Sequence, residues 1–593
     1  MNMKDIRREK PYPLGVSFSG DRICFAVDGG AGQECVLKIY KKDSKKTAVN
    51  ISMDKTYKTG NVFSCSIRNV FDDDTDYEYV FEIDGVECMD SRAKLVKGRN
   101  NYGKPSSNLR AVLTPDAQTD YGITDYTKPA VNNLVLYQLH VRGFSKHKSF
   151  SGSNKGTFLG ICDKIPYLKE LGVNGVLLLP AYEYNEIPKD TVPVGMPKDI
   201  PFDDVDDDDK NGRVNYWGYT TDAFYFAPKT SYASGNNAID EFSCMVSKLH
   251  ENGIAVLMDM HFPGKNHMNM IVDCLRHWVV NYNVDGFRIN NDSVDEGVLR
   301  CDPVLADTYI LGNYWYERNV VSDNVPKFAD CNDSFMNRIR QFIKGDNNNI
   351  LELVYEMMEN GYGAGGISKV NYLADVNGFT LMDSLSYNMK HNEANGENNH
   401  DGTEFNYSMN CGFEGKTRRK YVLERRRKYI KNELMLLMMS YGIPMLLAGD
   451  EFGNSQEGNN NAYCQDNRIS WLDWSQMAKN KELVDYVSRL IEIRNNNLLA
   501  EFESKHPIAS GIPEISYHGV KPWATDGLSY NRTAGIMIAS KGLYIAINMD
   551  GNKHEFELPK LYDECQWKLH ISTSDNHNEG FVLPSETIAI YLC

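Results

Sequence analysis

The sequence lacks a long hydrophobic run and a secretory leader. The nearest candidate for a membrane span, "NELMLLMMSYGIPMLLAG" at 432–449, is interrupted by Gly442 and Pro444 and is typical of a helix, a turn and a buried strand. The N-terminal stretch "MNMKDIRREKPYPLGV" has charges but no apolar segment of the kind a signal peptide needs. We therefore expect a protein that neither enters a membrane nor carries an export signal.

Cysteine is present without any pattern. The chain has 13 cysteines, an odd number, and no CxxC pair. In a chain this long, scattered cysteines favour reduced thiols over a disulfide framework or a zinc site. This usage predicts a cytoplasmic protein.

The chain has fewer basic than acidic residues. Lys and Arg number 64 against 80 Asp and Glu, which gives a formal charge of -16, and no basic patch interleaved with aromatics is visible. Nucleic-acid binding needs a basic face, so we expect no nucleic-acid partner. A neutral substrate would be indifferent to the charge.

The densest acidic run spans Asp203–Asp209. We interpret it as a solvated insertion loop. Calcium binding is the alternative, because clustered carboxylates suit hard cations, but the run lacks the spaced ligands and turn glycine of a calcium loop. We therefore predict no metal site and no cofactor.

The pattern of apolar residues changes twice along the 593 residues, a length that predicts about two to four domains. Residues 12 to 100 alternate apolar and polar positions ("RICFAVDG", "YEYVFEIDGVE"), as in a β-sandwich. From 130, buried-type strands ("LVLYQLH", "GVLLLP", "IAVLMDM") alternate with amphipathic helices, and after 484 strands return ("GLYIAINM", "TIAIYLC"). We predict a multidomain α/β protein: a β-sandwich at 1–105, a (β/α)8 TIM barrel at 106–484 and a β-sandwich at 485–593. Periodicity alone leaves an open doubly wound sheet as an alternative to the barrel.

Several long segments carry a family resemblance. They are "KIPYLKELGVNGVLLLP", "NYWGYTTDAFYFAP", "VDGFR", "DPVLADT", "SYNMKHNEANGENNHDG" and "GIPMLLAGDEFGNSQEGNNNAYCQDNRISWLDW". The chain resembles the isoamylase and glycogen-debranching branch of glycoside hydrolase family 13. "PYPLGVSF" with "YEYVFEIDG" resembles the glycogen-binding sandwich of carbohydrate-binding module family 48. The resemblance implies the same three-part architecture and retaining hydrolysis of α-1,6 branch points in glycogen or amylopectin.

The chain departs from this family at its three catalytic acids. The nucleophile follows Gly-Phe-Arg-x as Asp in relatives, where this chain has Asn290. The acid/base Glu corresponds to Asn313 in "DPVLADTYILGNYWY", and the third acid, in His-Asp-Gly-Phe-Thr-Leu, corresponds to Asn377. The His beside that third acid is Val376. Retaining glycosidases use a carboxylate nucleophile and a carboxyl acid/base, and an amide supplies neither a negative charge nor a labile proton. The three positions are therefore predicted to be non-functional in catalysis.

Two nearby aspartates are possible substitutes for the missing acids. Asp292 and Asp375 lie two residues from Asn290 and Asn377, a step of about 6.5–7 Å along a strand, and the two displacements run in opposite directions. We favour structural roles instead: Asp292 capping a helix or turn, and Asp375 pairing inside the barrel. Arg288, which the family keeps, is expected to hydrogen-bond the side-chain carbonyl of Asn290.

Other positions match or alter the family's substrate groove. Asp259 and Arg288 match family positions at the barrel mouth, whereas Pro263 and Gly264 replace the Asn-His that relatives carry after that aspartate. Trp217, Tyr219 and Trp315 are candidate sugar-stacking rings, with barrel packing as an equal alternative. The Gly/Asn-rich "GNNNAYCQDN" is expected to line the substrate groove structurally.

Three functional hypotheses follow. The first is a catalytically silent protein that binds an α-glucan such as glycogen, as a scaffold or as the regulatory subunit of an active debranching enzyme. The second is an active hydrolase or transglycosylase, cleaving α-1,6 or α-1,4 bonds with displaced acids such as Asp292 or Asp375. The third is a groove that contacts only proteins.

Overall fold

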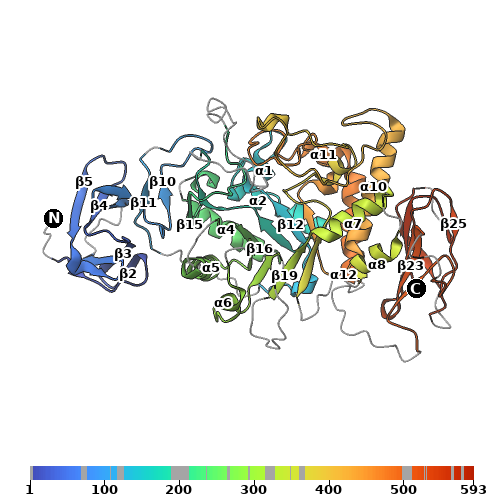
Figure 1. The fold of residues 1–593 in the computed structure, drawn as a ribbon, viewed down its shortest axis with the longest axis horizontal. Helices are drawn as coiled ribbons and strands as arrows, with labels where there is room; N and C mark the ends of the chain where they lie inside the picture. Colours follow the sequence, from blue (N-terminus) through green and yellow to red (C-terminus); the bar gives the residue numbers. More distant parts are fainter. Residues whose placement is uncertain are drawn as a thin grey trace.

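The computed structural model describes most of the chain in three consecutive parts. It describes residues 5–68, 76–106, 108–115, 126–187, 213–235, 237–263, 268–290, 294–313, 315, 327–346, 349–358, 367–496, 511–525, 528, 531–561, 566–575 and 580–593. A β-sandwich at the N-terminal end, a central barrel and a second β-sandwich follow one another along the long axis (Figure 1). The acidic run Asp203–Asp209, Gly264 and Asp292 lie outside the described residues.

The N-terminal sandwich consists of two antiparallel sheets. One has the strand order β1-β7-β3-β2 with β6 beside β7, and the other has β10-β11-β8-β4-β5 with β9 beside β8. Alternate side chains such as Leu37, Ile39 and Phe81 are buried between the sheets, as the period of two predicts. The strands are β1 (Arg7–Arg8), β2 (Gly15–Ser19), β3 (Arg22–Asp28), β4 (Cys35–Lys41), β5 (Thr47–Met53), β6 (Lys58–Thr59), β7 (Val62–Arg68), β8 (Tyr77–Ile83), β9 (Val86–Cys88), β10 (Val96–Lys97) and β11 (Arg110–Val112).

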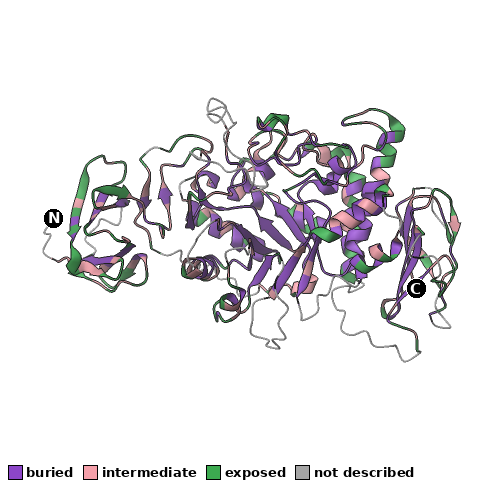
Figure 2. Ribbon diagram, viewed as in Figure 1, coloured by how far each residue is buried: buried purple, intermediate pink, exposed green. Residues whose placement is uncertain are grey.

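The central part is a closed barrel of parallel strands, which confirms the TIM-barrel prediction over the doubly wound alternative. The order is β12-β13-β16-β17-β18-β19-β20-β21, with β21 pairing back to β12. These strands are mostly buried on both faces (Figure 2), which explains their near-continuous apolar sequences. They are β12 (Leu136–Leu139), β13 (Gly175–Leu178), β16 (Ala255–Met260), β17 (Gly286–Ile289), β18 (Tyr309–Gly312), β19 (Lys327–Asn332), β20 (Ser368–Tyr372) and β21 (Ile443–Leu447). A hairpin of β14 (Tyr182–Tyr184) and β15 (Ala223–Pro228) extends from the barrel.

Helices surround the barrel and connect its strands. The longer ones bury an apolar face; α4, for example, buries Ile239, Phe242, Met245 and Leu249 at helical spacing. The helices are α1 (Val141–Lys146), α2 (Phe158–Cys162), α3 (Ile165–Leu171), α4 (Ala238–His250), α5 (Met268–Tyr282), α6 (Glu296–Arg300), α7 (Asp333–Lys344), α8 (Ile350–Met358), α9 (Leu381–Ser384), α10 (Lys420–Met438), α11 (Ser475–Lys479) and α12 (Lys481–Asn496). Over the described ranges, none of them has both the length and the apolar character needed to span a bilayer.

The C-terminal sandwich pairs a sheet of order β22-β23-β24-β28-β26 with a short β25-β27 ribbon. Its strands are β22 (Ile515–His518), β23 (Thr533–Ile538), β24 (Leu543–Asn548), β25 (His554–Glu555), β26 (Lys568–Ser572), β27 (Val582–Leu583) and β28 (Thr587–Leu592). The predicted boundaries at 105/106 and 484/485 fall a few residues before these changes of architecture. β11 still belongs to the N-terminal sheet, and α12 runs across residue 484.

The cysteines follow the expectation with one exception. Eleven cysteines in the described ranges are free thiols, and several are buried, including Cys35, Cys65 and Cys274. Cys593, which follows β28, takes part in a disulfide, so the expectation of thiols throughout is wrong at that position. A disulfide requires two Cα atoms within about 7 Å, and spacing along the sequence does not reveal that proximity.

Candidate functional site

Three barrel strands bring the predicted catalytic positions to one end of the barrel. Asn290 directly follows β17, Asn313 directly follows β18, and Asn377 lies five residues after the end of β20. The strands are parallel, so their C-terminal ends open on the same face, where barrel enzymes build their active sites. Asn290 is half-buried, whereas Asn313 and Asn377 are exposed.

Arg288 on β17 has a carboxylate partner, but it is not at the expected position. Its two terminal nitrogens donate to both oxygens of Asp375, at 3.1 and 2.6 Å. The prediction that Arg288 binds the Asn290 carbonyl is therefore wrong: the Asn290 Oδ1 accepts from the backbone N–H of Phe262 at 3.1 Å instead. A bidentate carboxylate satisfies the planar guanidinium better than one amide oxygen does. The alternative prediction, that Asp375 pairs inside the barrel, is confirmed.

The ion pair fixes the charge of both partners. Burial alone would raise the pKa of Asp375, but the charge and hydrogen bonds of Arg288 outweigh it and hold that pKa below its ordinary value. Burial works against the Arg288 charge as well, yet Asp375 raises the pKa of Arg288 well above its usual value. Asp375 is thus ionised at neutral pH, and both of its oxygens accept from the guanidinium.

Asp259, at the end of β16, has the opposite electrostatic character. Its Oδ2 accepts from the Tyr219 hydroxyl at 2.8 Å, and the side chain is buried. Burial raises the pKa of Asp259 to about 6, although Arg288 and the Tyr219 hydrogen bond act in the other direction. Tyr219 is half-buried and its ring lies 4.8 Å from that of His261. Asp259 and Tyr219 are each recognisable in the sequence, but their hydrogen bond is not, since no local signal links residues forty positions apart.

The aromatic candidates divide between two environments. Trp217 lies in a cluster at the barrel mouth with Leu179, Tyr216 and Val376. Trp315 packs in the main core, edge-on to Phe328 with ring centroids 5.0 Å apart, and only 5% of it is exposed. Trp217 is only 3% exposed, so the packing interpretation holds for both tryptophans, and neither offers a face to a sugar.

A small cavity lies beneath the barrel mouth. It has a volume of about 40 Å³ and is bordered by Trp217, Val376, Gln138, Tyr216 and Ser470. Among the described residues, the Tyr216 hydroxyl and the Ser470 hydroxyl have no protein hydrogen-bond partner although they are buried. This volume and polarity suit one ordered water, whereas ligand pockets run to about 300 Å³ or more. A sugar ring therefore does not fit into this cavity.

Comparison with known proteins agrees with this architecture. A closed parallel barrel between two β-sandwiches defines the class. Residues 142–269 match the family model "Alpha amylase, catalytic domain". The chain also resembles two pullulanase structures, which shows the fold: a type I enzyme from Bacillus subtilis complexed with maltose (19% identity, TM-score 0.69, 99% of this chain and 86% of that chain) and the GBS pullulanase SAP complexed with maltotetraose (16%, 0.73, 98% and 88%).

Curated relatives place the chain within that class. The glycogen operon protein GlgX homolog of Mycobacterium tuberculosis is 32% identical over 75% of this chain and 72% of its own length. The corresponding protein of Haemophilus influenzae is 30% identical over 82% and 84%, and rice chloroplastic isoamylase 1 is 27% identical over 98% and 84%. The chain belongs to the isoamylase and GlgX glycogen-debranching branch of glycoside hydrolase family 13.

Proposed function

We propose that this protein binds α-glucans such as glycogen without hydrolysing them, as a scaffold or as the regulatory subunit of an active debranching enzyme. One observation carries the proposal: Arg288 is bound by both oxygens of Asp375, while amides occupy the three positions that the resemblance assigns to the catalytic acids. The N-terminal sandwich would act as a carbohydrate-binding module of family 48. The free thiols fit a cytoplasmic location.

The remaining carboxylates are poorly suited to double displacement. A retaining mechanism needs a free carboxylate and a proton donor about 5–5.5 Å apart, on either side of the glycosidic bond. Asp375 already binds Arg288 with both oxygens, so attack on a sugar carbon would require breaking a buried ion pair. Asp259 carries a proton more readily than an ordinary aspartate, but it would be an acid without a nucleophile.

Glucan binding rests on the relatives and on the polar side chains at the barrel mouth. The pullulanase structures named above are complexes with maltose and maltotetraose. In this chain Tyr219, Asp259 and Arg288 still stand at the barrel mouth, where they can contact sugar hydroxyls.

Affinity electrophoresis tests the binding. Migration in a native gel should be retarded by glycogen, added maltotetraose should relieve the retardation, and no reducing ends should appear during prolonged incubation. Serum albumin serves as the control for sieving by the polysaccharide. If no polysaccharide retards the chain, the glucan hypothesis is wrong and a groove that contacts only proteins takes its place.

Restoring the three acids tests whether their replacement is what makes the protein catalytically inactive. Asn290→Asp, Asn313→Glu and Asn377→Asp should be combined with Asp375→Ala, because Asp375 otherwise holds Arg288 and adds a negative charge beside the restored nucleophile. We expect α-1,6 hydrolysis from the fourfold variant, at least tenfold less from the threefold one, and none from the unmodified chain.

A second measurement tests the alternative that the protein is an active hydrolase with displaced acids. Turnover of a branched glucan by the unmodified chain, lost in Asp375→Ala and in Asp292→Asn, would replace our proposal with a hydrolase using displaced acids. A fourfold variant that folds but stays inactive would point to Val376 or to the altered loop after Asp259 as further losses.

A further inference from the structure

A groove between the N-terminal sandwich and the barrel is lined by cations. It has a volume of about 590 Å³, within the range of small-molecule pockets, and its lining includes Lys104, Arg142, Lys146 and Lys155. No Asp or Glu of the described residues lines it. Asp466 neutralises Arg142, so Lys104, Lys146 and Lys155 leave a local excess of three positive charges on a chain whose formal charge is -16.

Of the three lysines in this lining, Lys146 is the most buried. It is half-buried at the end of α1, and no ion pair joins it to a carboxylate among the residues the structure describes. Burial lowers the pKa of Lys146, and the charges of Arg142 and Lys155 lower it further, with Asp466 as the opposing influence. The Asp466 carboxylate is itself bound by Arg142 through two nitrogens at 2.8 and 2.9 Å.

Close packing holds Arg142 and Lys146 together. Gly156, with a φ of +76°, lies against both: a Cβ added there would stand 3.0 Å from the Lys146 Cδ and 3.4 Å from the Arg142 Cγ. A left-handed glycine at this contact lets the backbone approach the two cationic side chains. Like charges held side by side cost stability, which proteins commonly accept where an anion binds.

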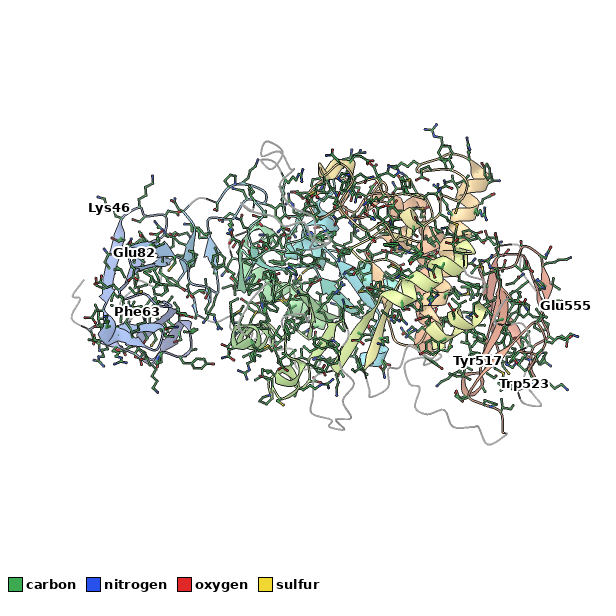
Figure 3. All side chains as sticks on the ribbon, viewed as in Figure 1. Lys46, Phe63, Glu82, Tyr517, Trp523 and Glu555 are labelled. Atoms are coloured by element: carbon green, nitrogen blue, oxygen red, sulfur yellow. The ribbon has the colours of Figure 1, made fainter. Side chains whose placement is uncertain are left out.

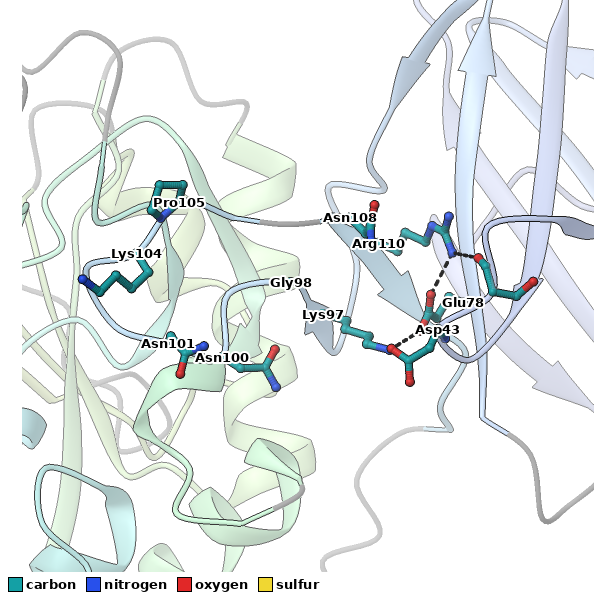
Figure 4. A pocket seen from close by; sticks show the side chains of 11 residues that line it. Asp43, Glu78, Lys97, Gly98, Asn100, Asn101, Lys104, Pro105, Asn108 and Arg110 are labelled. Carbon is teal, nitrogen blue, oxygen red and sulfur yellow. Dashed lines mark hydrogen bonds and ion pairs between the residues drawn. The ribbon is translucent and has the colours of Figure 1, made fainter.

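The neighbouring cleft shows what a compensated site looks like in the same molecule. There Lys97 pairs with Asp43 and Glu78, and Arg110 pairs with Glu78, so the cations are neutralised (Figure 4). Lys104 and Asn101 lie on the barrel side of that view, apart from those ion pairs. The neighbouring cleft and the cation-lined groove share Asn100, Asn101 and Lys104 as lining. Among the described residues, carboxylates line the neighbouring cleft and not the groove.

We propose that this groove binds the phosphate monoester of a sugar. A phosphate group carries about −1.5 to −2 charge at neutral pH and accepts several hydrogen bonds, which matches the ammonium groups of Lys146 and Lys155. The amides of Asn100 and Asn101 and the hydroxyl of Ser153 border the same space and suit sugar hydroxyls. The inference is independent of whether the barrel mouth is catalytic.

Calorimetric titration of the full chain with glucose 6-phosphate tests the proposal, with glucose and inorganic phosphate as separate arms. We expect binding of glucose 6-phosphate, weaker binding of phosphate and none of glucose, with affinity falling as salt rises from 50 to about 300 mM. Lys146→Gln combined with Lys155→Gln should weaken binding at least tenfold. Lys46→Gln, at the outer part of the N-terminal sandwich (Figure 3), is the charge-matched control and should change nothing.

The melting temperature provides a second measurement, which distinguishes a ligand-binding lysine from one with a purely structural role. Lys146→Gln should raise the melting temperature without ligand and reduce the shift that glucose 6-phosphate produces. Lys155→Gln changes an exposed side chain, so it keeps the test valid if the double variant folds poorly. Absence of glucose 6-phosphate binding, or unchanged binding in these variants, would overturn the proposal. Equal affinity for inorganic phosphate would overturn its sugar component.

Discussion

The ion pair between Arg288 and Asp375 links β17 to the segment that follows β20. Both side chains are largely buried, so each pays a desolvation cost that only the partner offsets. Asp375→Asn should therefore destabilise the protein by about 3–5 kcal/mol, because it leaves a buried arginine without a counter-charge. Combining it with Arg288→Met should recover most of that loss, as measured by urea unfolding. Equal stability of the single and double variants would show that the pair is not coupled.

Asp259 gives the site a pH-dependent stability. Its folded-state pKa of about 6 exceeds the value of about 3.9 expected in the unfolded chain, so the folded state binds this proton more tightly. Stability from this group is therefore greatest below about pH 4 and falls as pH rises through 6, by at most about 3 kcal/mol.

Asp259→Asn should remove that dependence. The melting temperature of the variant, compared with the unmodified chain, should rise more at pH 7.5 than at pH 4.5. Glu555→Gln, an exposed carboxylate on the C-terminal sandwich (Figure 3), is the control and should give the same small difference at both pH values. If the melting temperatures of both variants changed in the same way between the two pH values, the raised pKa assigned to Asp259 would be wrong.

Among the elements, α12 is tied to the end of α10 by one arginine. Arg494 is buried, and its guanidinium donates to the carbonyls of Met438 and Ser440 at 2.8 and 2.6 Å and to that of Gly442. These carbonyls end α10 and form the turn into β21, where the helix dipole also favours a cation. The arginine thus replaces the missing intrahelical donors.

Arg494→Ala should destabilise the protein by about 3 kcal/mol or more, because buried carbonyls lose their donors and a cavity forms. Arg489→Ala on the same helix is the matched control. Its side chain is exposed and donates to the His570 carbonyl at 3.0 Å, so the cost should stay below about 1 kcal/mol. Chemical denaturation of both variants decides the matter; similar costs would refute the role given to Arg494.

The sequence was informative where the signal is local. The stretches "GVLLLP" and "VDGFRI" contain β13 and β17, and the interruption at Gly442 does separate α10 from β21, whereas Pro444 is the second residue of that strand. It was uninformative about partners distant along the chain. Arg288 and Asp375 are 87 residues apart, and their pairing depends on how the barrel closes, which periodicity does not encode.

At the scale of the whole molecule, the N-terminal sandwich and the barrel share a core. Phe224 and Ala227 of β15 are buried in the same apolar cluster as Leu37 and Phe81 of the sandwich. A composition shift near residue 105 predicted two separate domains and could not show that a barrel hairpin completes the core of the first. The structure therefore predicts that the two parts unfold together.

Arg92 provides the test of this coupling. It reaches from the sandwich to Asp273 on α5 at 3.0 Å, and its guanidinium lies 4.7 Å from the centre of the Phe226 ring. Arg92→Ala removes a largely buried ion pair and a cation–π contact, so we expect a loss of about 2–3 kcal/mol and an earlier calorimetric transition that separates from that of the barrel. Arg68→Ala breaks a pair of similar length, 2.9 Å to Asp21, but one that is exposed within the sandwich, and it should cost less than about 1 kcal/mol. A single unshifted transition in Arg92→Ala would mean that the apolar contacts of β15 alone unite the two parts, with no need for the ion pair.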